Sequence, residues 1–311
     1  MQWSQIKTVF IICFLILNIF LVYQLINRQG EEITYIMEPS REEELEFNIN
    51  GLRDLSDDIF TAPLLYAQNY NYNQEATEDL AKLQSQKTVI VDDYYLYSRF
   101  DEPIPLNSKG FEEIIAENIY KGNDYVYWGE IDSARVLVFF QQVEQPIFFN
   151  QNAVMYIHLN AEGAMTQYVQ TRLSQAGERE EERSLIQQYD AVYRLYHNSN
   201  VLQTDDTITG ARLGYHNIVS LPNGEQLLNP TWDIEVNDED HHFINALEGH
   251  IYSQNEDFFQ ENIATFIELL EDASDDELEF YQLDDDQDEL ISILRQALVG
   301  VYKNIVEVDS E

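Results

Sequence analysis

The chain begins with a long apolar run, Val9–Ile26, which spans 18 residues and carries no charged side chain. A helix of this length rises about 1.5 Å per residue and just crosses a hydrocarbon core of roughly 30 Å. The run continues into polar sequence without the small-x-small cleavage site of a secretory signal. We therefore predict an uncleaved membrane anchor over residues 9–26, preceded by a short leader (1–8) and followed by a juxtamembrane linker (27–39).

The charges that flank this run leave its orientation nearly undecided. Lys7 and the α-amino group lie on one side, and Arg28 and Arg41 lie on the other. The positive-inside count is therefore close to a tie. A short leader ahead of a long domain is typical of a signal anchor with a cytoplasmic N-terminus, and it favours that orientation.

After residue 60 many stretches alternate between apolar and polar residues or are rich in β-branched and aromatic residues, which indicates strands. Turn residues with Gly, Pro and Asn separate them, and such short connections join antiparallel neighbours. The five candidates between residues 125 and 173 therefore predict one antiparallel meander. The strand candidates are 63–72, 87–91, 94–98, 125–128, 136–142, 147–150, 153–159, 165–173, 210–221, 226–236 and 242–253.

Helical patterns lie between these strands. Ser40 and Glu43 form a capping-box pattern that opens a short helix through about Asn50. Asn73 and Ser108 are candidate caps for two further helices. Apolar residues recur at helical spacing in 76–83, 111–119 and 185–196, and the last helix follows the acidic segment 178–182. The whole pattern predicts an α+β fold of two lobes, mostly antiparallel, with helices packed on the sheets and a boundary near residues 173–178.

The C-terminal segment has a different pattern. Two amphipathic helices, 258–270 and 290–305, are separated by acidic residues. They predict either a helical hairpin that docks on the domain or a mobile tail. We expect the folded α+β domain to span residues 40–253 and to tolerate removal of the acidic helical extension, residues 254–311, at a cost of a few kcal/mol at most.

Composition narrows the possible partners. The chain has 57 acidic and 17 basic residues, a net charge of −40, and such a surface repels nucleic acid and anionic lipid. Its hydrophobic content of 44% and aromatic content of 13% favour a folded core over disorder. Its only cysteine, Cys13, lies in the anchor, so neither an intrachain disulfide nor a soluble thiol nucleophile is available.

Motifs for chemistry are few. The sequence has no phosphate-binding glycine loop, no His-Glu-x-x-His and no Gly-x-Ser-x-Gly. His241 and His242 are either a metal site or a surface turn, and adjacent strand residues point to opposite faces, which favours the turn. Asp284–Glu289 begins like a calcium loop but has no glycine at position six and has Arg295 at position twelve. Tyr125–Trp128 is a core strand or a sugar-binding groove. We predict no catalytic, metal-binding or cofactor-binding residues.

Several segments of the chain resemble the YycI (WalI) family of membrane-anchored bacterial regulators. The N-terminal sequence MQWSQIKTVFIICFLILNIFLVYQ is similar to that of the family. The resemblance continues in order to about residue 253. It is carried by residues 127–129, 138–141, 147–150, 157–160, 168–171, 214–224, 229–232 and 243–251.

This resemblance implies a protein with a cytoplasmic N-terminus, one transmembrane helix and an extracytoplasmic domain. It also implies a non-enzymatic role together with a YycH-type sibling protein. The two would adjust a sensor histidine kinase of the WalK (YycG) type that controls cell-wall metabolism. Thr231–Ser253 is also faintly similar to the end of a PepSY domain. The alternative to a kinase regulator is an extracytoplasmic wall-active hydrolase or ligand-binding protein.

Asn18 lies near the middle of the apolar run, where an unpaired amide is costly. Polar residues at this depth often bond across helices, although a single Asn is also tolerated facing lipid. We predict that Asn18 faces a partner helix. Phe14, Leu15, Leu21 and Leu25 are expected to pack around it.

Overall fold

The structure is a computed structural model, and it describes residues 3–28, 40–106, 110–177, 180–198, 201–220, 225–253, 255–283 and 286–308. The chain forms two compact units, Met1–Glu44 and Leu45–Glu311. Most of the predicted linker, residues 29–39, and the predicted cap Ser108 lie outside the described residues. The first two residues of the linker, 27 and 28, form the end of the first helix.

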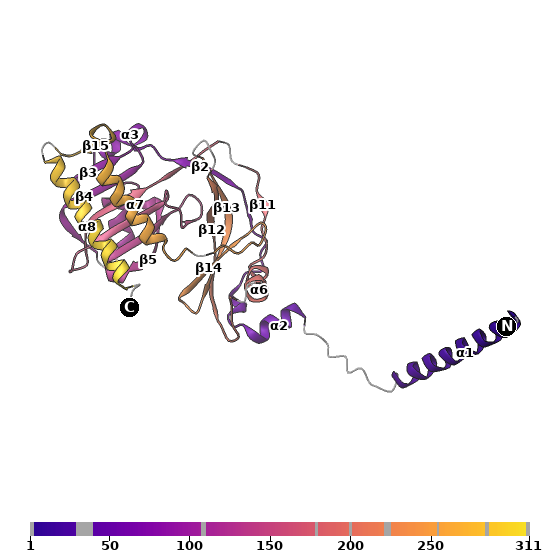
Figure 1. Cartoon of the computed structure of the whole chain (residues 1–311). Helices are drawn as coiled ribbons and strands as arrows, with labels where there is room; N and C mark the ends of the chain where they lie inside the picture. The colour runs from indigo at the N-terminus through magenta and orange to yellow at the C-terminus, as the bar shows by residue number, and fades with distance from the viewer. Residues whose placement is uncertain are drawn as a thin grey trace. The chain divides into compact units, whose positions relative to one another are not determined.

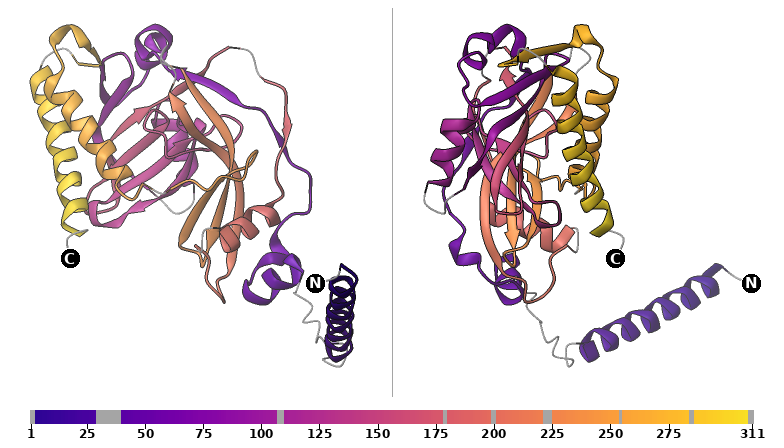
Figure 2. Two further views of the ribbon diagram at one scale, coloured as in Figure 1. Left: turned by 45° about the vertical axis from the view of Figure 1, so that its right-hand side comes forward. Right: turned by 90° about the vertical axis from the view of Figure 1, so that its left-hand side faces the viewer.

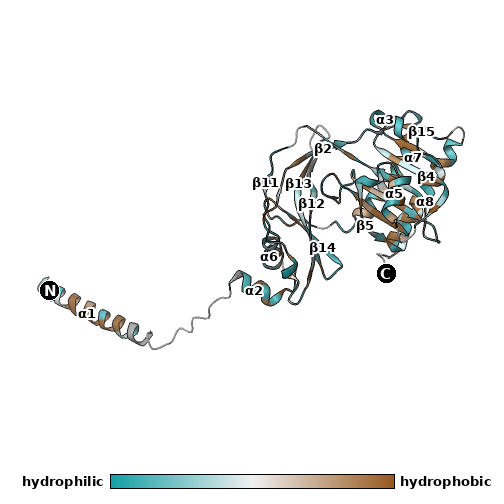
Figure 3. Ribbon diagram, turned by 180° about the vertical axis from the view of Figure 1, so that it is seen from behind, coloured by the Kyte–Doolittle hydropathy of each residue, from teal (hydrophilic) through white to brown (hydrophobic). Residues whose placement is uncertain are grey.

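The first unit contains helix α1, Trp3–Arg28 (Figure 1). Within it, Lys7–Gln24 is the single segment of the described helices that is long and apolar enough to cross a membrane. None of this segment is buried inside the protein, and Figure 3 colours most of α1 as hydrophobic. Because so much apolar surface is unfavourable in water, the helix fits the predicted anchor.

Helix α2, Arg41–Asn48, begins with the predicted capping box. The Ser40 amide donates to Glu43 Oε2 at 2.9 Å, and the Glu43 amide donates to Ser40 Oγ at 3.2 Å. These two bonds satisfy backbone donors that have no partner within the helix. The helix ends two residues before the predicted Asn50.

A seven-stranded, entirely antiparallel sheet is the centre of the second unit, and it has the order β15-β3-β4-β9-β8-β6-β5. Both faces of this first sheet are covered, because all six positions of the strand β6 are buried. The strands are β3 Gln86–Val91, β4 Tyr95–Pro105, β5 Tyr125–Ile131, β6 Val136–Gln141, β8 Val154–Leu159, β9 Ala164–Thr171 and β15 Leu278–Tyr281.

The second sheet has the order β10-β2-β13-β12-β7, and β14 also pairs with β13. The chain passes between the two sheets several times, because β2, β7 and β10 belong to the second sheet while β3 to β6, β8 and β9 belong to the first. Helix α6, Gln188–Asn198, and the end of α2 pack on this sheet around Trp232. Its strands are β2 Leu65–Asn69, β7 Ile147–Phe148, β10 Leu173–Gln175, β12 Ile208–Ser220, β13 Gln226–Val236 and β14 Asp240–Asn245. A separate pair joins β1 Thr61–Ala62 to β11 Arg183–Ser184.

Two helical layers enclose the first sheet. On one face lie α5, Phe111–Asn118, and the short helices α3, Tyr72–Glu75, and α4, Thr77–Leu80. On the other face lie α7, Phe258–Asp272, and α8, Gln287–Val308, which run side by side (Figures 1 and 2). The alternation of strand residues decides which face each side chain joins, so that Phe139 packs with the α5 layer and Phe140 with the α7–α8 layer.

The core does not end near Ser253, contrary to our expectation. Ile263, Phe266 and Leu294 are at most 1% exposed and pack on the first sheet. The segment also supplies the edge strand β15, which pairs with β3. Of the two alternatives for this segment, the docked hairpin is the one that the structure shows, and its packing is more extensive than we expected. The two helices share one face of the sheet with Phe148 and Phe243 of the second sheet.

The structure differs from the sequence pattern at three further places. The strand β7 leaves the predicted meander and pairs in parallel with β12 of the second sheet. The helix expected over 76–83 is two short turns, and the cap is Asn71, whose side chain accepts from the Gln74 amide, rather than Asn73. Helix α6 starts at Gln188, because Arg183–Ser184 forms β11 instead of a helical turn.

Candidate functional site

The predicted contact residues lie mostly on one side of α1. At 3.6 residues per turn, Phe14, Asn18, Leu21 and Leu25 fall within about 60° of one another, and Leu15 lies beside them. Phe14, Leu15 and Asn18 also line a shallow groove on the helix surface. The Leu25 side chain lies outside the described residues.

Asn18 already has a hydrogen bond within its own helix. Its Nδ2 donates to the Phe14 carbonyl oxygen, one turn earlier, at 2.8 Å. An amide has two N–H hydrogens and a carbonyl oxygen. The second hydrogen and the oxygen are therefore the groups with which Asn18 can bond a neighbouring helix.

The second candidate site is built around a buried carboxylate that the sequence analysis missed. Asp233 on β13 is fully buried, and its cross-strand partner on β12 is Arg212. Arg212 donates to Asp233 Oδ2 from Nη2 at 2.7 Å and from Nε at 3.2 Å. His241 on β14 donates from Nδ1 to Asp233 Oδ1 at 2.8 Å. One carboxylate thus binds one side chain from each neighbouring strand, Arg212 from β12 and His241 from β14.

Trp128 of the first sheet packs against this cluster. Its ring centroid lies 4.5 Å from that of His241 and 5.4 Å from the Arg212 guanidinium carbon. It also contacts Phe140, Phe148, Phe149 and Phe243, with ring centroids 5.1–6.1 Å away. Asp233 therefore positions two groups that hold Trp128 in place.

A cavity of about 370 Å³ opens beside Trp128, and we call it the Trp128 pocket. Its apolar wall comes from both sheets and from the start of α7. The rings of this wall are those of Trp128, Phe149, Phe243, Phe258 and Phe259. His216 and His241 add two imidazoles, and Glu239, Asp240 and Glu256 lie at its edge. The volume is at the small end of the range for ligand pockets, about 300–1,000 Å³.

The two adjacent histidines do not act together. His241 stacks near Phe243 on the pocket side of β14, whereas His242, the next residue, lies on the opposite face of the strand. Burial is the main cause that lowers the pKa of His242. Within the described ranges, no three His, Cys, Asp or Glu side chains are grouped so that they could hold a metal ion. The first two residues of the calcium-like segment, Asp284 and Asp285, lie outside the described residues.

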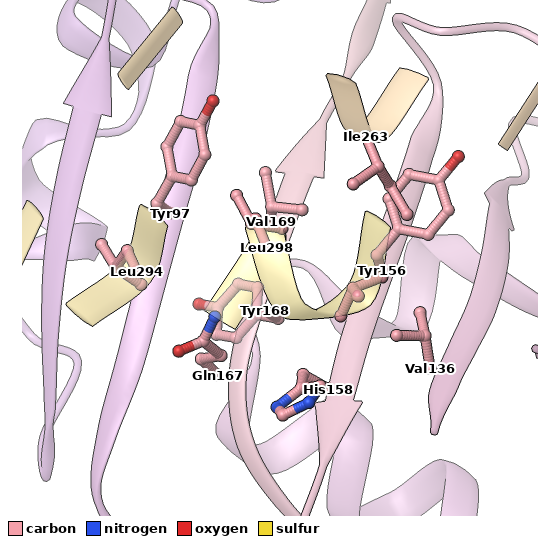
Figure 4. Close-up of a pocket in the computed structure, with 11 residues that line it drawn as sticks. Tyr97, Val136, Tyr156, His158, Gln167, Tyr168, Val169, Ile263, Leu294 and Leu298 are labelled. Atoms are coloured by element: carbon pink, nitrogen blue, oxygen red, sulfur yellow. The ribbon is translucent and has the colours of Figure 1, made fainter. Parts of the chain in front are cut away.

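A second cavity lies between the first sheet and the C-terminal helices (Figure 4). The side chains of Tyr97, Tyr156, His158 and Ile263 surround it. Its volume is about 10 Å³, which is close to the space that one water molecule needs. We interpret it as a packing defect beneath α8.

His158 at this cavity should make the protein less stable in acid. Burial, and then the positive charges of Arg135 and Arg99, lower its pKa below the usual 6.5. The unfolded chain therefore binds a proton at a higher pH than the folded chain, and stability is lost as pH falls below about 6.5. We expect His158→Gln to flatten the decline in unfolding free energy between pH 7 and pH 5, as measured by urea unfolding. An unaltered decline in His158→Gln would contradict this expectation.

Sequence reasoning had only one clue to the Trp128 pocket. The Tyr125–Trp128 strand was predicted to be either a core strand or a sugar-binding groove, and Trp128 packs against the core and also borders the pocket. The clue was Asp233, a charged residue between Trp232 and Ile234 in an apolar strand. Because a buried charge is rare without a partner, Asp233 indicates that basic side chains lie close to it.

The fold and the first helix define a two-sheet α+β protein with a candidate membrane span at its N-terminus. The YycI protein family matches residues 38–247, and the chain belongs to this family. The family is one of regulatory proteins, and membership supports a role in the regulatory system of the WalK (YycG) sensor kinase. The helices α7 and α8 lie beyond the matched residues.

A search of curated proteins found no match. Among solved structures, the chain is similar to an uncharacterized protein from Eubacterium rectale ATCC 33656. The identity is 11% and the TM-score is 0.43, and the match covers 67% of this chain and 89% of that chain.

Proposed function

We propose that this protein is a non-enzymatic, membrane-anchored regulator of a WalK-type sensor histidine kinase that controls cell-wall metabolism, acting together with a YycH-type sibling. The family match over residues 38–247 is the observation that carries this proposal. The candidate span Lys7–Gln24 supports it, because a regulator anchored in the same membrane meets the kinase at a high local concentration. The N-terminus is cytoplasmic and the second unit is extracytoplasmic in this proposal.

The experiment is crosslinking in intact membranes followed by purification of the full chain. We expect a WalK-type kinase and a YycH-type protein to be recovered with it, and deletion of the gene to change kinase output. Recovery of neither partner, with kinase output unaltered, would contradict the proposal. The wall-active hydrolase that we considered as an alternative is not favoured by the family match.

Within this function we propose that the Asn18 side of α1 contacts a partner's transmembrane helix. Asn18→Leu should leave the protein in the membrane at normal abundance but weaken its co-purification with the sibling or the kinase. A hydrogen bond between helices in a membrane contributes about 0.6–2 kcal/mol, so the association should fall about 3- to 30-fold.

Tyr23→Phe is the matched control for this substitution. Tyr23 lies about 180° around the helix from Phe14, and the change also removes one polar group. It should leave co-purification unaltered. If Asn18→Leu behaves like Tyr23→Phe at equal expression, Asn18 faces lipid and the contact lies elsewhere.

A further inference from the structure

The Trp128 pocket has an apolar interior that is only partly covered. Phe243 is buried, whereas Trp128, Phe149, Phe258 and Phe259 are each half-buried. These four rings therefore present apolar surface to the cavity without being closed off from solvent. An exposed, concave group of aromatic rings is a common feature of sites that accept an apolar side chain.

The charged residues at this pocket all have the same sign. Glu239, Asp240 and Glu256 are exposed at its edge, and no Lys or Arg is among the described residues that line it. Arg212, which lies 5.4 Å from the Trp128 ring centroid, is paired with the buried Asp233. Burial lowers the pKa of His216, so its ring stays neutral near pH 7 and does not offset the acids. The edge of the pocket thus has a negative potential around an apolar interior.

The aromatic rings do not form a platform for a sugar. A sugar stacks on a free, flat ring face, but the Trp128 ring already contacts His241, Arg212 and several phenylalanines. The other imidazole, His216, stacks on Tyr252 with 4.5 Å between centroids and an angle of 13°. The phenylalanine rings that line the pocket meet at varied angles, 37° between Phe149 and Phe259 and 77° between Phe258 and Phe259, and such a wall suits an apolar side chain.

We propose that the Trp128 pocket is the docking site for a basic peptide segment of a partner protein, with one aromatic or long aliphatic side chain as its anchor. The anchor fills the cavity between the two sheets and α7. Lysine or arginine residues on either side of the anchor lie against Glu239, Asp240 and Glu256. This inference goes beyond the regulatory function, because it names a surface and a chemistry that hold whichever protein carries the segment.

The test uses the full chain in zwitterionic nanodiscs and a fluorescein-labelled peptide, Lys-Phe-Lys-Leu-Lys, with binding followed by fluorescence anisotropy. We expect saturable binding that weakens as salt is raised. Two probes, Glu-Phe-Glu-Leu-Glu and Lys-Ser-Lys-Ser-Lys, should each bind at least about tenfold more weakly, because one lacks the charge and the other lacks the anchor.

Two matched triple variants locate the binding. Glu239→Gln/Asp240→Asn/Glu256→Gln should reduce affinity about tenfold, in line with three exposed ion pairs. Glu112→Gln/Glu113→Gln/Glu117→Gln removes the same charge from exposed positions on α5, on the opposite face of the first sheet, and should change affinity less than twofold. Phe259→Ala should weaken the peptide that carries the anchor but not Lys-Ser-Lys-Ser-Lys.

Three results would overturn the proposal. Equal losses of peptide affinity in the two triple variants would show that the basic peptide is attracted to the acidic protein as a whole and not to the pocket. Equal binding of the two lysine peptides would show that no anchor is used. Saturable binding of chitotriose that Phe259→Ala weakens, with no binding of the phenylalanine peptide, would show that the pocket is a carbohydrate site.

Discussion

Deleting residues 255–311 is expected to abolish cooperative folding of the second unit. The deletion removes α7, β15 and α8 and uncovers the part of the first sheet on which these helices pack. Eight side chains of this segment are at least 91% buried in the shared core, and each contributes about 1.5–3 kcal/mol on burial. The expected loss exceeds about 10 kcal/mol, which equals the whole stability of many domains. The eight are Ile263, Phe266, Leu270, Leu290, Leu294, Leu298, Val301 and Ile305.

The uncovered face makes this loss worse. Val89, Tyr97, Val138 and Tyr156 would be exposed together, and the Tyr97 hydroxyl would lose its bond to the Phe266 carbonyl oxygen, 2.9 Å long. The strand β3 would become an open edge that can pair with another chain. Near-ultraviolet circular dichroism and urea unfolding should show a molten or aggregated product. A cooperative transition in the truncated chain would mean that the helices are only loosely attached.

Point substitutions on α7 provide a finer version of this experiment. Phe266 is fully buried, so Phe266→Ala should lower the unfolding free energy by about 3–5 kcal/mol. Glu268→Ala, at an exposed position on the same helix, should change it by no more than about 0.5 kcal/mol.

The features that the sequence revealed are those coded by neighbouring residues. The capping box at Ser40 and Glu43, the apolar run of α1 and the alternation in β6 and β8 each depend on spacing within a few residues. The class of the fold, α+β with mostly antiparallel sheets, follows from these elements and their short connections and is confirmed.

The features that the sequence did not reveal depend on contacts between distant segments. Residues 147–150 look like another meander strand, but β7 is only two residues long and pairs with β12, nearly seventy residues later. The C-terminal helices are amphipathic, which shows that they have an apolar face but not which surface receives it. Arg183–Ser184 pairs with β1, and this distant partner overrides the helix-favouring glutamates before it.

Of the two candidate sites, one depends on neighbouring residues and the other on distant segments. The side of α1 that contains Asn18 could be read from helical spacing alone, and whether it contacts a partner remains a prediction. The Trp128 pocket combines residues from β5, β12, β14 and α7, and no local motif relates Trp128 to His241. Only the register of β12, β13 and β14, which brings Arg212 and His241 to Asp233, creates that arrangement.

Replacing Asp233 is expected to have the largest effect of any single change at this arrangement. Asp233→Leu removes the acceptor of three hydrogen bonds and leaves Arg212 and His241 without their carboxylate. Removal of one partner from a buried ion pair costs about 3–5 kcal/mol. Because Arg212 is 46% exposed and can regain water, we expect a value near 3 kcal/mol in urea unfolding of the full chain. Asp79→Asn, at the exposed ion pair with Lys82, should change stability by less than about 0.5 kcal/mol.

A second substitution identifies why Asp233→Leu lowers the unfolding free energy. If it comes from the guanidinium left without a partner, Asp233→Leu/Arg212→Met should be more stable than Asp233→Leu alone, because an apolar pair of similar size can replace a buried ion pair. If the cost comes instead from disturbed packing of β13, the double variant should be no more stable than the single one. Intrinsic fluorescence of Trp128 in a Trp3→Phe/Trp232→Phe background reports separately on the positions of Arg212 and His241. Loss of Arg212 and His241 from their positions beside the ring should alter its emission in Asp233→Leu, even under conditions where the variant remains folded.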